Sequence, residues 1–249
     1  MSGSWWTVPI RRPRAELQLF CLPHAGGGAA MFAPLATLLP ETIQLQAILL
    51  PGREARFREP AHARMTPLIT ALADALAPSL AGRYALFGHS MGALVAFELA
   101  RELRRRGKPL PELLIVSGRR SPDLVLDERP LHVLSDEAFV AEIQARYGGI
   151  PQMILDEPEL MALFLPTLKA DFAVFETHRF VPEPPLACAL TFYGGDADPQ
   201  SAPAASAGWS SLVAGPTSRR IFPGGHFYLN EQRGALADAL AEDLLARVG

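Results

Sequence analysis

The 249-residue sequence contains only two cysteines, Cys21 and Cys188, and they lie far apart inside apolar runs. Two isolated cysteines cannot build a disulfide scaffold, and their spacing matches no zinc-binding motif. An unpaired cysteine usually behaves as a small apolar side chain. We therefore expect both residues to be buried free thiols.

The sequence also lacks an apolar run of the roughly 18 residues that a membrane-spanning helix needs. Residues 1–14 carry their charges after a short apolar stretch, which is not the order of a secretion signal. The formal net charge is −3, so the composition gives no electrostatic reason to expect nucleic-acid binding. We expect a cytoplasmic protein that binds neither membranes nor nucleic acid.

Glycine and proline are plentiful, at 20 and 23 residues, but they follow no repeating period. This composition is typical of a globular chain with many turns and argues against a collagen-like or disordered one. At roughly 150 residues per domain, the length fits either one large domain or two small ones.

Short, almost continuous apolar runs alternate with helical patterns along the chain. Such runs are typical of strands that helices cover on both faces. The runs fall at residues 17–22, 43–50, 84–87, 113–117, 187–193 and 220–222. The helical patterns fall at about residues 66–80, 91–106 and 233–248. The alternation predicts an α/β fold with a mostly parallel central sheet and helices on both faces.

Residues 119–185 interrupt this alternation because they contain no convincing strand. They predict helices at 135–147, 157–165 and 168–176, and Ser135 followed by two acidic residues is a helix-start signature. The segment is longer than a crossover connection needs. We therefore expect a separate helical layer over one end of the sheet.

The strongest chemical signal is the pentapeptide GHSMG at residues 88–92, which fits the pattern G-x-S-x-G. A predicted strand precedes it and a predicted helix follows it, which is the context of a nucleophile elbow. Ser90 would then occupy a strained turn, with Gly88 and Gly92 allowing the strand and the helix to approach closely. Ser90 is the candidate nucleophile, and the alternative is an incidental turn with a solvated serine.

A serine needs a general base to become a good nucleophile. His226 follows a short predicted strand and precedes the last predicted helix, where the base stands in the chain order Ser, Asp, His. We assign it as the base, against the alternative of a buried structural histidine. We expect the other histidines beside the serine, at His24 and His89, or at the surface, at His62, His132 and His178.

The third member should be an acid in the loop after the strand at residues 187–193, where Asp196 and Asp198 both lie. We favour Asp198, which stands 28 residues before His226 and directly before a proline that fixes the turn. Its carboxylate would hold the imidazole tautomer and stabilise the imidazolium. Asp196 is expected to shape the loop instead.

Acyl transfer also needs hydrogen-bond donors for the oxyanion. Met91, directly after the candidate nucleophile, supplies one backbone N–H, and the loop after the first strand should supply the second. Ala25 is the favoured donor in that loop, and Gly26 stays open as an alternative. The glycine run lacks the GK[ST] ending of a phosphate-binding loop, which argues against a nucleotide site.

Six motifs together resemble one family. They are PHAGGGA (23–29), LPGREARFREP (50–60), GHSMGALVAFELA (88–100), LPTLKADF (165–172), YGGDADP (193–199) and GGHFYL (224–229). The chain resembles the type II thioesterases of non-ribosomal peptide and polyketide synthesis, which are α/β-hydrolases. The resemblance covers about residues 19–245 and implies that residues 119–185 are a helical lid. It also implies a triad of Ser90, Asp198 and His226, with oxyanion donors at Ala25 and Met91. Because Ser90, Asp198 and His226 must converge on one sheet that spans most of the chain, we expect a single α/β-hydrolase domain over residues 1–249.

The resemblance further implies hydrolysis of acyl thioesters on the phosphopantetheine arms of carrier proteins. Such an enzyme clears stalled or wrongly primed acyl groups from large synthases. Acyl or peptidyl carrier proteins would be its partners, and we expect a monomer with no metal or cofactor of its own. The alternatives are a medium-chain acyl-carrier thioesterase, a general carboxylesterase, acyl transfer to an acceptor other than water, and a non-catalytic binding protein.

Basic side chains gather where the helix after Ser90 ends, at Arg101, Arg104, Arg105, Arg106 and Lys108. Cations are favourable at a helix C-terminus, so we expect a solvated helix end. Docking of an acidic carrier protein is the alternative hypothesis. Arg53 and Arg56, in the motif LPGREARFREP, form a second candidate rim for the carrier or its pantetheine arm.

Overall fold

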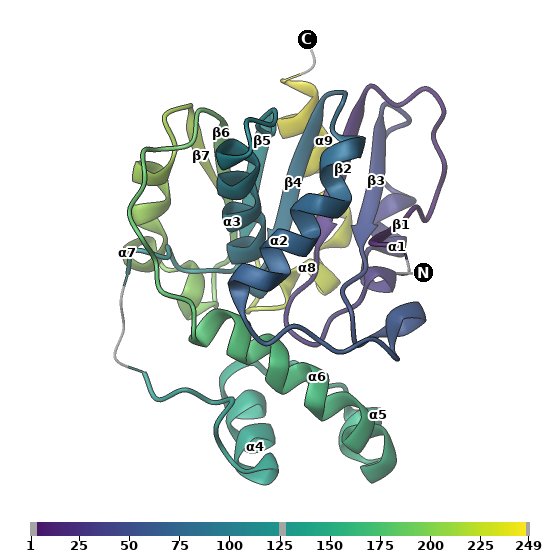
Figure 1. The fold of residues 1–249 in the computed structure, drawn as a ribbon, viewed down its shortest axis with the longest axis vertical. Coiled ribbons are helices and arrows are strands. Elements are labelled where there is room, and N and C mark those ends of the chain that lie inside the picture. Colours follow the sequence, from purple (N-terminus) through teal and green to yellow (C-terminus); the bar gives the residue numbers. More distant parts are fainter. Residues whose placement is uncertain (1–3, 125–127, 248–249) are drawn as a thin grey trace.

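The computed structural model describes residues 4–124 and 128–247, and in these ranges it forms one seven-stranded sheet (Figure 1). The strands are β1 (Trp6–Thr7), β2 (Leu17–Leu22), β3 (Ile43–Ile48), β4 (Tyr84–His89), β5 (Leu113–Ser117), β6 (Ala189–Gly195) and β7 (Thr217–Phe222). Their spatial order is β1-β3-β2-β4-β5-β6-β7. Among these described strands, only the pairing of β1 with β3 is antiparallel. The mostly parallel sheet predicted from the sequence is therefore confirmed.

Helices cover both faces of the sheet, which explains why its strands are almost continuously apolar. α2 (Met65–Leu76) and α3 (Met91–Arg105) pack on one face (Figure 1). α1 (Ala33–Ala36), α8 (Tyr228–Glu231) and α9 (Arg233–Leu245) pack on the other. The short α7 (Pro203–Ser206) lies between β6 and β7. The sequence predicted the last helix to residue 248, and Val248 lies outside the described residues.

The strands at the two edges of the sheet are those that the sequence predicted least well. β1 is a two-residue antiparallel strand and was not predicted. β7 begins at Thr217, although only its last residues, 220–222, were predicted. Its first residues are polar and exposed because the strand lies at the edge of the sheet. The apolar pattern on which the prediction relied is therefore missing there.

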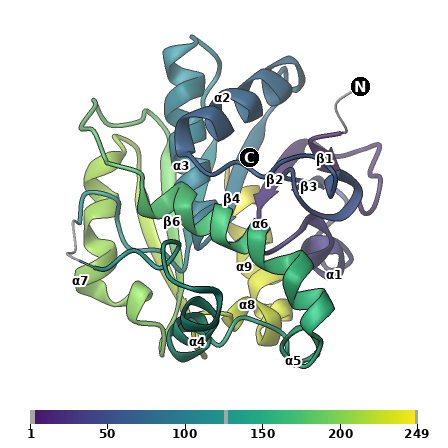
Figure 2. The ribbon, with the colours of Figure 1, turned by 60° about the horizontal axis from the view of Figure 1, so that its bottom comes forward.

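The segment between β5 and β6 forms three helices, and its described residues contain no strand. They are α4 (Asp136–Tyr147), α5 (Gln152–Leu155) and α6 (Pro158–Glu176). Ser135 begins α4 as predicted, because its Oγ accepts a hydrogen bond from the backbone N–H of Ala138. Figure 2 shows α6 running across the end of the sheet, with α4 and α5 beside it. We call residues 119–185 the helical insert.

α6 is one continuous helix, so the prediction of two helices separated near Pro166 was wrong. A proline inside a helix costs about 3 kcal/mol because it removes a hydrogen bond and crowds the preceding turn. Tertiary contacts on both sides of the proline outweigh this cost. Leu165 and Leu168 are buried in the core of the insert, and Thr167 Oγ1 donates a hydrogen bond to the carbonyl of Gly52 over 2.9 Å.

Both cysteines are free and buried, as expected from their apolar surroundings. Burial raises the pKa of the Cys21 thiol well above its usual value and that of Cys188 to about 11. Both thiols therefore stay protonated at neutral pH. Within residues 4–124 and 128–247, no helix is long and apolar enough to span a membrane.

Candidate active site

Ser90 lies in a sharp turn between β4 and α3, with φ +55° and ψ −114°. Two glycines make this turn possible, because the elements around it touch. A Cβ atom at Gly88 would lie well under 3 Å from the carbonyl of Gly92, and one at Gly92 would lie equally close to the carbonyl of Leu22. Ser90 N–H donates to the carbonyl of Ser117 on the neighbouring β5, over 2.8 Å. The backbone thus holds Ser90 in a conformation that side-chain-bearing residues rarely adopt.

The structure brings together the three side chains that the sequence analysis selected. His226 Nε2 lies 3.0 Å from Ser90 Oγ, and His226 Nδ1 lies 3.0 Å from Asp198 Oδ2. The three residues come from the β4–α3 turn, the loop after β6 and the loop after β7. A carboxylate on Nδ1 holds the proton there, which leaves Nε2 free to accept the hydroxyl proton of Ser90.

Asp198, and not Asp196, contacts the imidazole. The Asp198 carboxylate also accepts hydrogen bonds from Gln200 N–H and from Ser201 Oγ, each over 3.0 Å. These bonds fix its orientation in a position where it is 4% exposed. Asp196 Oδ1 accepts from Gly224 N–H over 2.9 Å and so shapes the loop before His226, as expected.

Two further histidines surround His226, and the sequence had predicted only that they lie near the serine. The rings of His89 and His226 are 5.1 Å apart, and the rings of His24 and His89 are 6.1 Å apart. Burial lowers the pKa of His24 to about 4 and that of His89 well below its usual value. Both imidazoles are therefore neutral at pH 7, so neither adds a positive charge beside His226.

Two backbone N–H groups near Ser90 remain available for an oxyanion. Met91 N–H is in the first turn of α3, where no intrahelical acceptor exists. Ala25 N–H has no acceptor among the described residues. Gly26 N–H, the alternative left open by the sequence, already donates to Asp171 Oδ2 over 2.7 Å. The geometry therefore favours Ala25 over Gly26 as the second donor.

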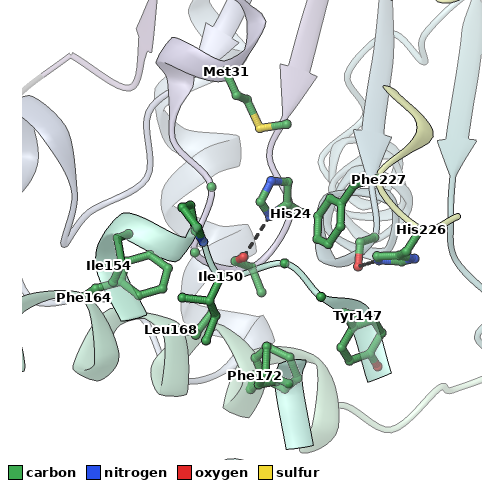
Figure 3. Close-up of a pocket in the computed structure, with 18 of the residues that line it drawn as sticks. His24, Met31, Tyr147, Ile150, Ile154, Phe164, Leu168, Phe172, His226 and Phe227 are labelled. Carbon is green, nitrogen blue, oxygen red and sulfur yellow. Dashed lines mark hydrogen bonds between the residues drawn. The ribbon is translucent and has the colours of Figure 1, made fainter. Parts of the chain in front are cut away.

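A pocket of about 480 Å³ opens beside Ser90 and His226, between the sheet loops and the helical insert (Figure 3). His24, His226 and Phe227 form one side, and Phe164, Leu168 and Phe172 of α6 form another (Figure 3). Tyr147 and Ile150, at and after the end of α4, complete the wall. Among the described residues, no Asp, Glu, Lys or Arg side chain lines the pocket. The site therefore suits an uncharged, apolar ligand.

Arg53 and Arg56 do not form an exposed rim, so that part of the sequence analysis was wrong. Arg53 is 8% exposed and pairs with Asp171 of α6, and Arg56 is 3% exposed and pairs with Glu59. Glu59 is only three residues from Arg56, but the partner of Arg53 could not be recognised from the sequence. Asp171 stands 118 positions from Arg53, and no local pattern connects the two.

The arginines at the end of α3 are paired with acidic side chains. Arg101 and Arg104 bond Glu183, which follows the insert helices, and Arg105 and Arg106 bond Glu102. Each of these four arginines thus forms an ion pair within the chain, which weakens the hypothesis that the cluster docks an acidic carrier. No group of three or more His, Cys, Asp or Glu side chains in the described part of the chain could hold a metal ion.

A family model and several known proteins match almost the whole chain. A family model described as a thioesterase domain matches residues 17–246. Thioesterase PikA5 of Streptomyces venezuelae is 39% identical over 253 residues, which cover 100% of this chain and 88% of the relative. Gramicidin S biosynthesis protein GrsT of Aneurinibacillus migulanus is 34% identical over 242 residues, or 97% of this chain and 94% of the relative.

The fold also matches a solved structure. The type II thioesterase BorB from the borrelidin biosynthetic cluster superimposes with a TM-score of 0.85 and 37% identity over 97% of both chains. The expected α/β-hydrolase fold is therefore confirmed.

The packing around the elbow predicts that Gly92→Ala is strongly destabilising. The new Cβ atom would press against the backbone of β2, which cannot move aside as a flexible side chain would. We expect the free energy of unfolding in urea to fall by about 2 kcal/mol or more. The control is Gly234→Ala on α9, where a Cβ atom meets nothing within 4 Å. Equal stability of Gly92→Ala and the wild type would contradict the tight packing.

The lowered pKa of His24 predicts a loss of stability in mild acid. Below about pH 6.5 the unfolded chain protonates His24, whereas the folded chain keeps it neutral down to about pH 4. Stability should therefore fall as the pH drops through this window. Near pH 5.5, His24→Gln should reduce the pH slope of the unfolding free energy by about one proton, with no change of slope at pH 8. An unchanged slope at pH 5.5 would show that His24 is protonated in the folded protein.

Proposed function

The chain belongs to the thioesterase family, and from this premise we propose that it is an editing type II thioesterase. It removes stalled or wrongly primed acyl groups from the phosphopantetheine arms of carrier proteins in non-ribosomal peptide or polyketide synthesis. The observation that carries the proposal is the hydrogen-bonded series Ser90–His226–Asp198 beside an uncharged pocket. The names of GrsT and BorB, which refer to gramicidin S biosynthesis and a borrelidin cluster, support the same setting.

In the proposed reaction, Ser90 Oγ attacks the thioester carbonyl while His226 Nε2 takes the hydroxyl proton. The C–S bond then breaks, and His226 returns the proton to the sulfur, which leaves as the free thiol of the pantetheine arm. Water, deprotonated by His226, then attacks the carbonyl carbon of the acyl-enzyme. The bond between that carbon and Ser90 Oγ breaks, His226 returns the proton to Oγ, and the carboxylic acid is released. The carboxylate of Asp198 stabilises the imidazolium that forms in each half of the reaction.

The negative charge that develops on the carbonyl oxygen is stabilised by Ala25 N–H and Met91 N–H. Both groups belong to rigid backbone beside Ser90, so they need no reorganisation when the charge forms. The neutral state of His24 and His89 is also favourable for the reaction, in which His226 becomes an imidazolium. Neither imidazole carries a charge that would disfavour protonation of His226.

The pocket favours short or medium acyl chains without charge. Its volume of about 480 Å³ is within the range of small-molecule sites, and aromatic and aliphatic side chains of α6 form much of its wall. A malonyl or other carboxylated group would bring a negative charge to a wall without a cationic partner, at a high desolvation cost. Uncharged acyl groups such as acetyl or butyryl meet no such penalty.

We propose that the enzyme acts as a monomer and uses acyl or peptidyl carrier proteins as partners. The mechanism requires no metal or cofactor bound by the enzyme, because the phosphopantetheine belongs to the carrier. We place the protein in the cytoplasm with the synthases that it serves, and its two buried free cysteines fit a reducing compartment.

The direct test uses a carrier protein loaded with butyryl-phosphopantetheine. The wild type should release butyric acid and regenerate the free thiol, which mass spectrometry of the carrier detects. Ser90→Ala should lower kcat by at least about 10⁴-fold, because the nucleophile is lost. Ser210→Ala, at an exposed serine outside the pocket, is the matched control and should leave the rate unchanged.

Substrate comparisons decide between the proposed function and its alternatives. Faster hydrolysis of simple oxygen esters than of carrier thioesters would indicate a general carboxylesterase. Release of the butyryl group to an acceptor other than water would indicate a transferase. Hydrolysis of malonyl-carrier as fast as butyryl-carrier would contradict the preference for uncharged chains.

A further inference from the structure

The glycine-rich loop that carries Ala25 is held by two side chains from distant parts of the chain. Gly26 N–H donates to Asp171 Oδ2 over 2.7 Å, and the carbonyl of Gly27 accepts from Arg53 Nη1 over 2.8 Å. Asp171 lies on α6 of the helical insert, and Arg53 lies in the loop after β3. One acceptor and one donor thus fix two successive residues of this loop.

Arg53 and Asp171 also hold each other rigidly. Arg53 Nη1 lies 2.8 Å from Asp171 Oδ2, and Arg53 Nη2 lies 2.7 Å from Asp171 Oδ1. This two-bond arrangement fixes the angle between the two side chains as well as their distance. The side chains are only 9% and 3% exposed, so water does not compete for these bonds.

The hydrogen bond to Asp171 is made by the central peptide of a tight turn in the loop. Gly27 N–H donates to the carbonyl of His24 over 3.0 Å, and Gly26 has φ +75°, so the four residues from His24 form a tight turn. The Ala25 carbonyl lies 2.9 Å from His24 Nδ1, and the N–H of the same peptide group donates to Asp171. Because this peptide is held at both ends, the direction of the preceding Ala25 N–H is fixed as well.

A third contact holds the far end of the same loop. Ala30 N–H donates to Glu54 Oε1 over 2.9 Å. Glu54 has φ +48°, which is uncommon for a residue with a side chain, and its carboxylate lies directly over Gly28. Arg53 and Glu54 are neighbours in the motif LPGREARFREP, and Asp171 belongs to LPTLKADF. The triad uses neither motif, and both meet at this loop.

We propose that Asp171, held by Arg53, is a positioning residue that aims the Ala25 N–H at the oxyanion. The helical insert would then take part in catalysis beyond covering the pocket, because α6 supplies the carboxylate that orients the loop. This inference rests on the proposed mechanism, in which Ala25 is an oxyanion donor. If Arg53 and Asp171 only stabilised the fold, replacing either would change the free energy of unfolding. It would have no selective effect on the transition state of thioester cleavage.

The test compares variants on the butyryl thioester of N-acetylcysteamine, a small substrate that needs no carrier protein. Asp171→Ala should lower kcat at least about tenfold with KM changed by less than about threefold, since an oxyanion donor acts mainly in the transition state. Asp171→Asn should lose less activity, because its amide oxygen still accepts from Gly26 N–H. Arg53→Lys should fall between these two, because lysine cannot form the two parallel bonds.

A second readout measures the oxyanion directly. An alkyl trifluoromethyl ketone adds to a serine hydroxyl and forms a tetrahedral oxyanion, whereas butyramide stays uncharged and planar. The affinity for the ketone should fall in parallel with kcat across the variants, and the affinity for butyramide should change much less. Lys169→Ala is the matched control, since Lys169 is on the same helix but bonds Asp136 and the carbonyl of Leu134 within the insert.

Three outcomes would overturn the proposal. The first is a folded Asp171→Ala variant with the kcat and ketone affinity of the wild type. The second is a Lys169→Ala variant whose kcat falls as much as that of Asp171→Ala. The third is an Asp171→Ala variant in which KM changes and kcat does not. If Asp171→Ala does not fold, Asp171→Asn and Arg53→Lys are judged by the same criteria. Failure of the editing function would look different, because the enzyme would cleave the small thioester through Ser90 but leave butyryl-carrier intact.

Discussion

The close approach of α3 to the ends of β4 and β2 is the constraint on which the site depends. Gly92 touches the backbone carbonyls of Leu22 and Pro23, so the first turn of α3 lies directly against the end of β2. This close approach places Ser90 and Met91 beside the loop that carries Ala25. A larger residue at Gly92 would separate the candidate nucleophile from one of its two proposed oxyanion donors, with no change to any functional side chain.

Buried carboxylates lie beside the pocket, and none of those that the structure describes lines it. The pocket is uncharged, and the buried carboxylates beside it each have a full set of partners. Asp198 accepts from His226, Ser201 and a backbone N–H, and Asp171 accepts from Arg53 and a backbone N–H. Buried charges persist only when paired in this way. Each carboxylate thereby fixes the direction of one group that the proposed chemistry uses, an imidazole in one case and a peptide in the other.

The features that could be predicted from the sequence are those that depend on neighbouring residues. Strands buried on both faces leave continuous apolar runs, and the spacing of Gly88 and Gly92 marks the elbow. The proline after Asp198 distinguished it from Asp196. Contacts between distant segments leave no such pattern in the sequence. Arg53 was predicted to lie at the surface, because its partner Asp171 is on the distant α6. Pro166 was predicted to separate two helices, although α6 continues through it.

The central claim is that acyl groups pass from a carrier thioester to Ser90 before water releases them. Rapid acid quench of the enzyme with butyryl-carrier, followed by peptide mass spectrometry, tests this most directly. We expect a butyryl group on the peptide that contains Ser90, at the same quench times at which the carrier protein loses its butyryl group. A butyryl group on another residue, or butyric acid formed with no acylated enzyme at any quench time, would contradict it.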